Sequence, residues 1–342
     1  FQAEDGIRDL VRSRGLGDVY KRQYMLSAVL QSVTGERVVD YLEKRLFQPL
    51  EIKKPEWDLS PEGVTTGGWG LRITTEDIAK LGQLYLQKGV WHGNRILSEA
   101  WVQEATSRQT STGSNPENDW DQGYGYQFWR CRYNCYRGDG AFGQFCIVIP
   151  EHEAVVAITS GTNDMGAIMK AVWEILLPAL ASEPVEPHSP TVQALARKLK
   201  DLKLPPVNGK SRSPVSKGLL QQKFQVLENA AGVHSVSFDL HGDDHRITVN
   251  MEHGIETLHL GNQKYVRSEM KQDLPYTQNM SRKIGASGGW VKPDEYHVKV
   301  YLTETPASIL YRFKFTDHRM TWTSELRHSL FGPRELPILR GE

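Results

Sequence analysis

Tyr136–Pro150 reads YRGDGAFGQFCIVIP and joins a small glycine-rich turn to an alternating apolar strand. The run Ala154–Ser160, AVVAITS, follows at once, which predicts a second strand after a tight connection. Glycine allows a backbone to approach a ligand closely and leaves its N–H groups free to point at that ligand. We therefore expect a site at the glycine-rich end of this strand.

Helical periodicity and cap residues mark four segments upstream of the hairpin. They are Tyr24–Thr34, which Gly35 ends; a run from Val38 that Pro49 stops; a helix opened by Thr74-x-x-Asp77; and a helix capped by Ser98. The first places Leu26, Val29, Leu30 and Val33 on one face. A long helix is predicted for Asp164–Leu180. Helices, antiparallel strands and one covering helix together indicate an α+β fold.

The first residues differ in character from the rest. Phe1–Gln23 scatters charged residues along its length, and Gly6, Gly15 and Gly17 interrupt any helical stripe. The segment resembles a translated sequencing adapter, so we expect it to be non-native and exclude it from fold reasoning. On this interpretation the protein's own N-terminus is missing.

The composition changes after residue 181. Residues 182–217 are rich in Pro, Ser and Lys and carry one short amphipathic helix with Val192, Leu195, Leu199 and Leu202, which predicts a linker. Residues 218–342 consist of short, partly alternating runs, which predict a small antiparallel barrel or sandwich. The expected strands are Val233–Leu240, Ile247–Met251, Glu256–Leu260, Tyr296–Leu302, Ile309–Phe315 and Met320–Leu326.

Bulk composition excludes several classes of protein. The 342 residues contain 41 Lys and Arg and 41 Asp and Glu, so we expect neither nucleic acid nor an anionic membrane as a partner. No apolar run reaches the ~20 residues that span a bilayer. Cys131, Cys135 and Cys146 are too few for a disulfide framework, and we expect buried, reduced thiols, no metal and a cytoplasmic location.

Tyr24 to about Leu180 resembles the penicillin-recognising serine hydrolases, which include class C β-lactamases, D-alanyl-D-alanine carboxypeptidases and related esterases and amide hydrolases. Three stretches carry the resemblance in the family's order: YMLSAVLQSVTGERVVDYLEKRLFQPL, GGWGLRITTEDIAKLGQLYLQKGVW and GDGAFGQFCIVIPEHEAVVAITSG. The resemblance implies a partial β-lactamase/transpeptidase-like fold. It also implies three active-site elements: Ser-x-x-Lys on a helix, Tyr-x-Asn, and a Lys-Thr-Gly or His-x-Gly strand.

Matched by position, Gly138-Asp139-Gly140 occupies the Lys-Thr-Gly site, and the N–H of Ala141 would be an oxyanion donor beside Gly140. The resemblance assigns a substrate-binding edge to Gly138, Asp139, Phe142, Gly68 and Trp69. For Asp139 the alternative is a turn residue that faces solvent. We expect Gln144–Ile149 to form the active-site edge of its sheet.

The other two elements have no match. Tyr-x-Asn is absent, and Ser-x-x-Lys occurs only at Ser268–Lys271, between predicted strands. Gly285–Gly289 matches the G-x-S-x-G nucleophile elbow around Ser287, but Pro293 follows and favours a β-turn. The histidines and aspartates around His241–Asp244 could hold a metal, but they indicate a solvated hairpin turn first. We therefore expect this chain to lack the nucleophile half and to be inactive.

The resemblance implies that the intact protein is a serine hydrolase that acts on a small-molecule ester or amide through an acyl-serine, with no cofactor. Gly138 in place of a cationic side chain favours a neutral substrate over a β-lactam or peptidoglycan carboxylate. The same replacement favours the alternative, a non-catalytic binding protein that keeps the penicillin-binding-like fold.

Overall fold

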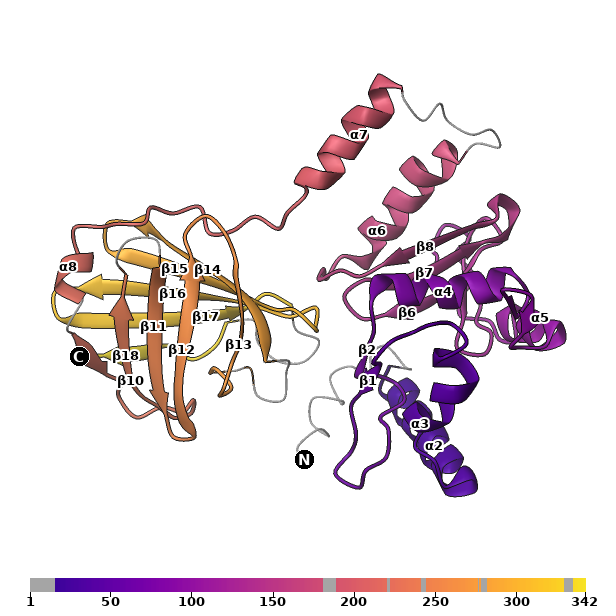
Figure 1. The fold of residues 1–342 in the computed structure, drawn as a ribbon, viewed down its shortest axis with the longest axis horizontal. Helices are drawn as coiled ribbons and strands as arrows, with labels where there is room; N and C mark the ends of the chain where they lie inside the picture. The colour runs from indigo at the N-terminus through magenta and orange to yellow at the C-terminus, as the bar shows by residue number, and fades with distance from the viewer. Residues whose placement is uncertain are drawn as a thin grey trace. The chain divides into compact units, whose positions relative to one another are not determined.

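The computed structural model describes residues 16–180, 189–219, 222–240, 244–275, 277, 282–328 and 335–342, with side chains from residue 23 onward. Residues up to 182 form one compact unit, and residues from 183 form another. Helices surround a small antiparallel sheet in the first unit, and strands dominate the second (Figure 1). The predicted α+β class is confirmed.

The helical elements of the first unit flank its strands in sequence. They are α2 (Leu16–Thr34), α3 (Val38–Leu42), the π-helical turn η2 (Glu43–Phe47), α4 (Thr75–Leu86), α5 (Glu99–Thr106), η3 (Pro150–His152), α6 (Met165–Ala171), the π-helical turn η4 (Val172–Leu176) and η5 (Leu177–Ala179). Two short hairpins pair β1 (Glu56–Trp57) with β2 (Leu71–Arg72) and β3 (Val90–Trp91) with β4 (Asn94–Arg95).

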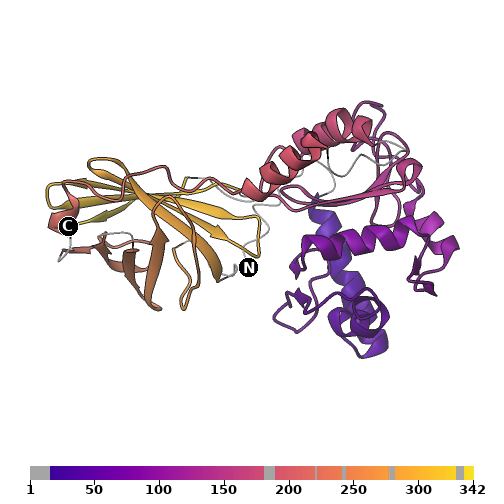
Figure 2. The ribbon, with the colours of Figure 1, turned by 45° about the horizontal axis from the view of Figure 1, so that its top comes forward.

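The main sheet of this unit has the order β5-β6-β7-β8, all antiparallel. Its strands are β5 (Trp129–Arg130), β6 (Tyr136–Gly140), β7 (Gln144–Ile149) and β8 (Ala154–Ile158). Alternation along β7 sends Phe145, Ile147 and Ile149 into a core with α6 and η4. On the other face the Sγ of Cys146 lies 3.3 Å from the carbonyl oxygen of Ile78 in α4. Helices α4 and α6 thus cover opposite faces of the sheet (Figure 2).

The predicted cap residues are confirmed. Thr74 and Asp77 form a capping box at the start of α4, and the Ser98 hydroxyl accepts the Trp101 N–H at the start of α5. Gly35 ends α2 with φ +72°, as a residue after a helix terminus should. Each of these signals acts within a few residues of the chain.

Helix α2 departs from the expectation in two ways. It begins at Leu16, inside the segment expected to carry no helical stripe, and continues through Gly17. Its apolar face is exposed: Leu26 is 62%, Val29 56% and Val33 80% accessible. The apolar pattern therefore marks a helix face that no described residue buries.

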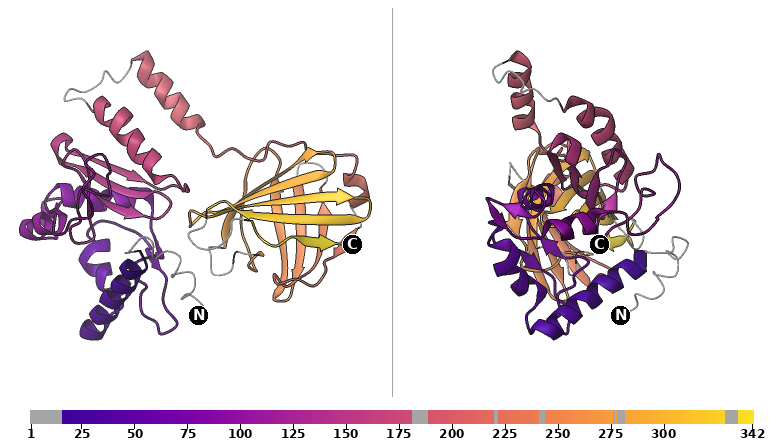
Figure 3. Two further views of the ribbon diagram at one scale, coloured as in Figure 1. Left: turned by 180° about the vertical axis from the view of Figure 1, so that it is seen from behind. Right: turned by 90° about the vertical axis from the view of Figure 1, so that its right-hand side faces the viewer.

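The second unit holds α7 (Pro190–Asp201), α8 (Ser216–Leu219) and a ten-stranded sheet. Its strands are β9 (Lys223–Gln225), β10 (Val233–Asp239), β11 (Asp244–Met251), β12 (Gly254–Gly261), β13 (Val266–Glu269), β14 (Lys283–Lys292), β15 (Glu295–Leu302), β16 (Ser308–Thr316), β17 (Arg319–Leu326) and β18 (Leu339–Gly341). Mutual backbone hydrogen bonds of 2.9 and 3.1 Å between Gln225 and Glu342 join the two ends of this sheet. The strands therefore close into a barrel, which is one of the two architectures predicted for this segment (Figure 3).

All six predicted strands of this barrel are present, but four further strands were not predicted: β9, β13, β14 and β18. Gly285–Gly289, predicted to be a β-turn, lies inside β14, where it pairs with β13 and β15. Gly288 is required there because a Cβ would lie 2.3 Å from the Tyr296 hydroxyl oxygen. A glycine-rich segment can thus form a strand where a neighbouring side chain fills the space beside it.

Within the described ranges, none of the helices combines the length and apolarity needed to cross a membrane.

Candidate functional site

The Gly138-Asp139-Gly140 tripeptide lies on strand β6 and not in a turn. It pairs with β7 in the register Gly138 to Cys146, Asp139 to Phe145 and Gly140 to Gln144. The prediction of a turn that starts at Tyr136 is therefore wrong for Tyr136–Gly140, which form a strand. The chain reverses direction only at Ala141–Gly143. The expected edge position of Gln144–Ile149 is also wrong, because β7 lies between β6 and β8.

The turn has an unusual backbone. Phe142 has φ +65° and Gly143 has φ +86°, and the left-handed region is uncommon for a non-glycine residue such as Phe142. The Ser160 hydroxyl donates to the carbonyl oxygens of Phe142 and Gly143, at 2.7 and 3.0 Å. Ser160 was not predicted as part of the site, although it was predicted as the last residue of the strand whose observed end is Ile158.

Gln144 completes this support. Its side-chain amide donates to the carbonyl oxygens of Ala141, at 3.2 Å, and Ser160, at 2.6 Å. These bonds draw the turn's carbonyl groups toward the protein. Among the described residues, none accepts a hydrogen bond from the Ala141 N–H. This donor is therefore available to a ligand, as an oxyanion donor must be.

The two glycines of β6 have different surroundings. A Cβ at Gly140 would lie 2.9 Å from the Cβ of Gln144, so Gly140 permits the close strand contact beside the turn. A Cβ at Gly138 would meet only the Cβ of Cys146, at 3.8 Å, which is ordinary contact. The missing side chain at Gly138 is therefore not imposed by packing.

Asp139 points to the other face of β6. Its side chain is 8% exposed, and its carboxylate accepts the Trp120 indole N–H at 3.0 Å and the Arg137 Nε–H at 3.1 Å. Burial raises the pKa of the Asp139 carboxyl, and the Arg137 guanidinium offsets this only in part. The solvent-facing alternative for Asp139 is wrong. Since strand side chains alternate, its carboxylate lies opposite Gly138 and Gly140.

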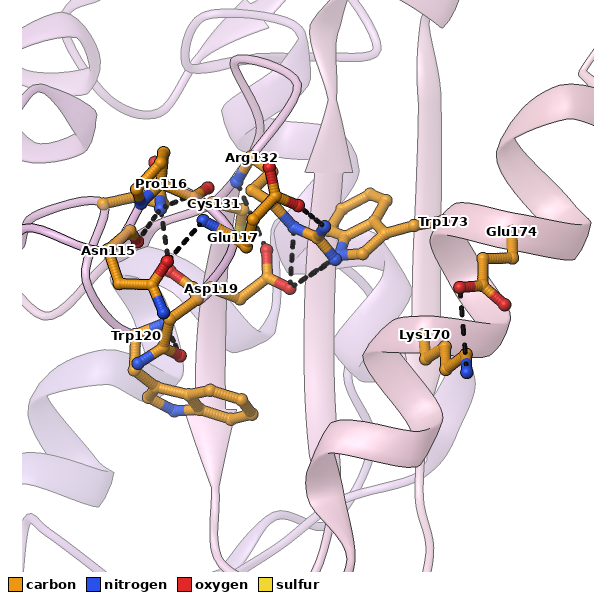
Figure 4. Close-up of polar contacts among 12 residues, drawn as sticks. Asn115, Pro116, Glu117, Asp119, Trp120, Cys131, Arg132, Lys170, Trp173 and Glu174 are labelled. Atoms are coloured by element: carbon orange, nitrogen blue, oxygen red, sulfur yellow. Dashed lines mark hydrogen bonds and ion pairs between the residues drawn. The ribbon is translucent and has the colours of Figure 1, made fainter.

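Asp139 and Arg137 belong to a buried polar network that the sequence did not indicate. Arg137 is fully buried and donates to the Asp119 carbonyl oxygen at 3.2 Å. The Asp119 carboxylate accepts the Trp173 indole N–H at 2.8 Å and lies 3.3 Å from the Arg132 guanidinium (Figure 4). Paired acidic and basic groups satisfy one another in this interior and hold the loop before β5 against β6 and the helix that carries Trp173.

Gly68 and Trp69 lie in a separate loop, which packs against α2. A Cβ at Gly68 would lie 2.4 Å from the Gln23 Oε1. The Trp69 carbonyl oxygen accepts the Thr66 hydroxyl at 2.6 Å and the Trp57 indole N–H at 2.8 Å, while the Trp69 side chain is 49% exposed. Two hydrogen bonds therefore hold the backbone of this loop at Trp69, and the indole ring is about half exposed.

Gln23 connects this loop to the sheet that carries the hairpin. Its amide donates to the Gln127 side chain, and the Gln127 Oε1 also accepts the Tyr124 hydroxyl at 3.2 Å. Gln127 directly precedes Phe128 and strand β5, the neighbour of β6. The helix α2 around Gln23 thus lies beside both the Gly68 loop and the β5 edge of the sheet.

The alternative nucleophiles occupy structural positions. Ser287 is fully buried in β14, where its hydroxyl donates to the Gly261 carbonyl oxygen and accepts the Val207 N–H, both at 3.1 Å. Ser268 lies on β13 and opens no helix. Of the expected hairpin turn, residues 241–243 lie outside the described residues. In the described part of the chain no three His, Cys, Asp or Glu side chains cluster as metal ligands would.

The cysteines are free and buried, as predicted. Burial raises the pKa of Cys131 to about 11, and the nearby Arg137 guanidinium opposes this rise. Burial likewise raises the pKa of Cys135 and the pKa of Cys146 to about 12. Because the thiolate is the nucleophile, none of these thiols is suited to covalent catalysis at neutral pH.

Comparisons with known proteins agree with this arrangement. The sequence pattern of the Beta-lactamase family matches residues 23–179. A 6-aminohexanoate-dimer hydrolase from Paenarthrobacter ureafaciens is 26% identical over 168 residues, which cover 45% of this chain and 43% of the relative. The chain therefore spans less than half the length of that curated relative.

Two solved structures are similar at lower identity. A putative 6-aminohexanoate-dimer hydrolase from Bacillus anthracis is 17% identical, with a TM-score of 0.40 and coverage of 47% of this chain and 43% of that chain. An octameric penicillin-binding protein homologue from Pyrococcus abyssi is 15% identical, with a TM-score of 0.33 and coverage of 92% and 62%. The match over residues 23–179 makes this part of the chain similar to the beta-lactamase family.

Proposed function

We propose that the whole protein is a serine hydrolase that cleaves a neutral ester or amide through an acyl-serine intermediate. The serine oxygen attacks the substrate carbonyl carbon, and the carbonyl oxygen becomes an oxyanion that the Ala141 N–H stabilises. The alcohol or amine leaves with a proton, and water then hydrolyses the acyl-serine. The name of the curated relative, a 6-aminohexanoate-dimer hydrolase, supports a hydrolytic activity.

One observation carries this proposal: the turn between β6 and β7 contains a backbone donor, the Ala141 N–H, that a substrate could use. The carbonyl groups around Ala141 are occupied by Ser160 and Gln144, while the Ala141 N–H has no acceptor among the described residues. A preorganised donor of this kind contributes about 3 kcal/mol to transition-state stabilisation, because no reorganisation is needed during the reaction.

The preference for a neutral substrate rests on Gly138. The corresponding family position holds a cationic or imidazole side chain, whereas here the neighbouring space is open, with Cys146 at 3.8 Å as the nearest contact. Without that side chain the site offers no cation at this position to a substrate carboxylate. We therefore assign an uncharged acyl group next to the scissile bond.

The proposal places the nucleophile outside the present sequence. Ser268 and Ser287 lie on barrel strands, and Gln23, at the point where the family match begins, already contacts the Gly68 loop. A Ser-x-x-Lys helix and a Tyr-x-Asn segment would have to precede this point. Under this proposal the chain as given binds its substrate without cleaving it.

The second candidate is a non-catalytic binding protein with the same fold, and Gly138 is the observation that favours it. A serine-directed fluorophosphonate probe, applied to the protein extended upstream in its gene, separates the two functions. The enzyme is expected to be labelled on a serine three residues before a lysine at the start of a helix. An extended, folded protein that is neither labelled nor active on p-nitrophenyl esters would establish the binding protein instead.

A further inference from the structure

Helix α7 is an amphipathic helix with no buried side chain. The Ser189 hydroxyl accepts the Val192 N–H at 3.3 Å, and Pro190 occupies the first turn, so the helix begins at a regular cap. It continues to Asp201, and Leu202 caps its C-terminal end. Local signals therefore fix the start of this helix, and none of its side chains is buried.

One face of α7 is apolar and exposed. At 100° per residue, Val192, Leu195, Leu199 and Leu202 fall within an arc of about 80°. The side chains of Leu195, Leu199 and Leu202 are 54%, 57% and 66% accessible, and Leu204 beyond the helix is 57% accessible. A leucine stripe of this length is normally covered, so a partner is needed to explain it.

Basic residues border this stripe on both sides. Lys198 projects about 80° to one side of its centre and Lys200 about 120° to the other, and Arg197 lies on the far face. The segment 189–217 contains seven basic residues and one acidic residue, although the whole chain carries no net charge. The charge balance of the whole chain therefore conceals a local positive segment that begins on α7 and continues beyond it.

We propose that α7 binds the surface of an anionic lipid bilayer. The leucine stripe would enter the boundary between headgroups and acyl chains. Lys198 and Lys200 would extend their stems along this boundary and place their ammonium groups among the lipid phosphates. Clusters of four to eight basic residues on an amphipathic helix suit this surface. Four of the seven, Arg197, Lys198, Lys200 and Lys203, lie on α7 or just beyond its end, which is the lower limit of that range.

Two other partners for the leucine stripe fit these observations less well than a bilayer does. A second copy packed through the same stripe would bring Lys198 and Lys200 of both helices together, and like charges at such borders repel. A groove on another protein is usually anchored by aromatic side chains, but no Phe, Tyr or Trp occurs between Trp173 and Phe224. Binding at the boundary between the anionic headgroups and the acyl chains of a bilayer needs no such aromatic anchor.

Vesicle co-sedimentation tests the proposal on the full chain. Vesicles of phosphatidylcholine with roughly one third phosphatidylglycerol are expected to bind it at least about tenfold more strongly than pure phosphatidylcholine, with binding weakened by salt. The variants Leu195→Ser/Leu199→Ser and Lys198→Glu/Lys200→Glu should each lose at least about tenfold in binding. Matched controls are Ile255→Ser and Lys314→Glu, which alter exposed barrel positions and should bind as the parent does.

The substituted side chains are exposed, so their replacement removes no core contact and the variants should remain folded. A circular dichroism spectrum identical to that of the parent verifies this. Absence of binding to the anionic vesicles overturns the proposal, as does equal binding by the parent and the stripe variant. A concentration-dependent dimer that Leu195→Ser/Leu199→Ser abolishes would assign the stripe to a second copy and would also overturn it.

Discussion

Replacing Gly143 by alanine should destabilise the first unit strongly, while the same replacement at Gly138 should not. At Gly143 the backbone has φ +86°, and a Cβ would lie 2.4 Å from the Ser160 Oγ and 2.5 Å from the Ile168 Cδ1. The left-handed backbone costs an L-residue about 1 kcal/mol, and overpacking adds roughly 1–3 kcal/mol. Displacement of Ser160 also weakens its two hydrogen bonds to the turn, which brings the expected loss to about 3 kcal/mol.

Gly138 is the matched control because it lies in the same hairpin with an open Cβ position. Its replacement by alanine should leave stability unchanged or raise it by about 0.5–1 kcal/mol, since glycine loses more backbone entropy on folding. Differential scanning calorimetry measures both variants against the parent. The transition of the first unit should fall by roughly 6–12 °C for Gly143→Ala and should not fall for Gly138→Ala.

The isolated segment Lys217–Glu342 identifies the barrel's own transition in these scans. Equal stability of the Gly143→Ala and Gly138→Ala proteins would contradict the expected clash and strain at Gly143. That result would show that the turn accommodates a side chain and that its backbone is not held as the Ser160 and Gln144 contacts indicate.

Four further outcomes are expected. The chain as given should not hydrolyse p-nitrophenyl esters or nitrocefin; turnover that persists in Ser268→Ala and Ser287→Ala proteins, with contaminating esterases removed, would contradict the assignment. In the gene-extended protein, Ala141→Pro removes the N–H and should lower turnover at least about a hundredfold, whereas full activity in a folded variant would disprove the donor role. The Lys217–Glu342 segment should fold alone, because its barrel closes through its own terminal strands; a random-coil circular dichroism spectrum would count against this. In the native protein, Cys131, Cys135 and Cys146 should not react with Ellman's reagent at pH 8, because thiols with a pKa of about 11 to 12 stay protonated there. In denaturant the same protein should release three equivalents of the coloured thiolate, one for each cysteine. Rapid reaction of the native protein would show that the thiols are accessible.

Local signals in the sequence were sufficient for several elements. The capping box of Thr74 and Asp77 and the cap at Ser98 begin helices where expected, because a helix start depends on side chains within one turn. The alternating runs of the second unit are strands for a similar reason, since a period of two places every second residue inward. The motif order from residue 24 to about 180 was also enough to recognise the family.

The geometry of the candidate site could be predicted from the sequence only in part. The glycine-rich end of the hairpin was predicted, but its first residues pair as strand β6, because β7 supplies hydrogen-bond partners that no local pattern reveals. The glycine run around Ser287 is likewise a strand, since Tyr296 from the next strand occupies the space beside Gly288. Both errors come from judging glycine by its backbone freedom alone.

The sequence alone was enough to predict the class of the fold, the helix caps, most barrel strands and the resemblance of residues 24 to about 180 to a known family. Only the tertiary structure decided which face each polar group occupies. It directs Asp139 to Arg137, supports the Ala141 turn through Ser160 and Gln144, and leaves the stripe of α7 uncovered. The physical reason is range: caps and periodicity act within a few residues, whereas burial, charge pairing and strand neighbours join residues far apart in the chain.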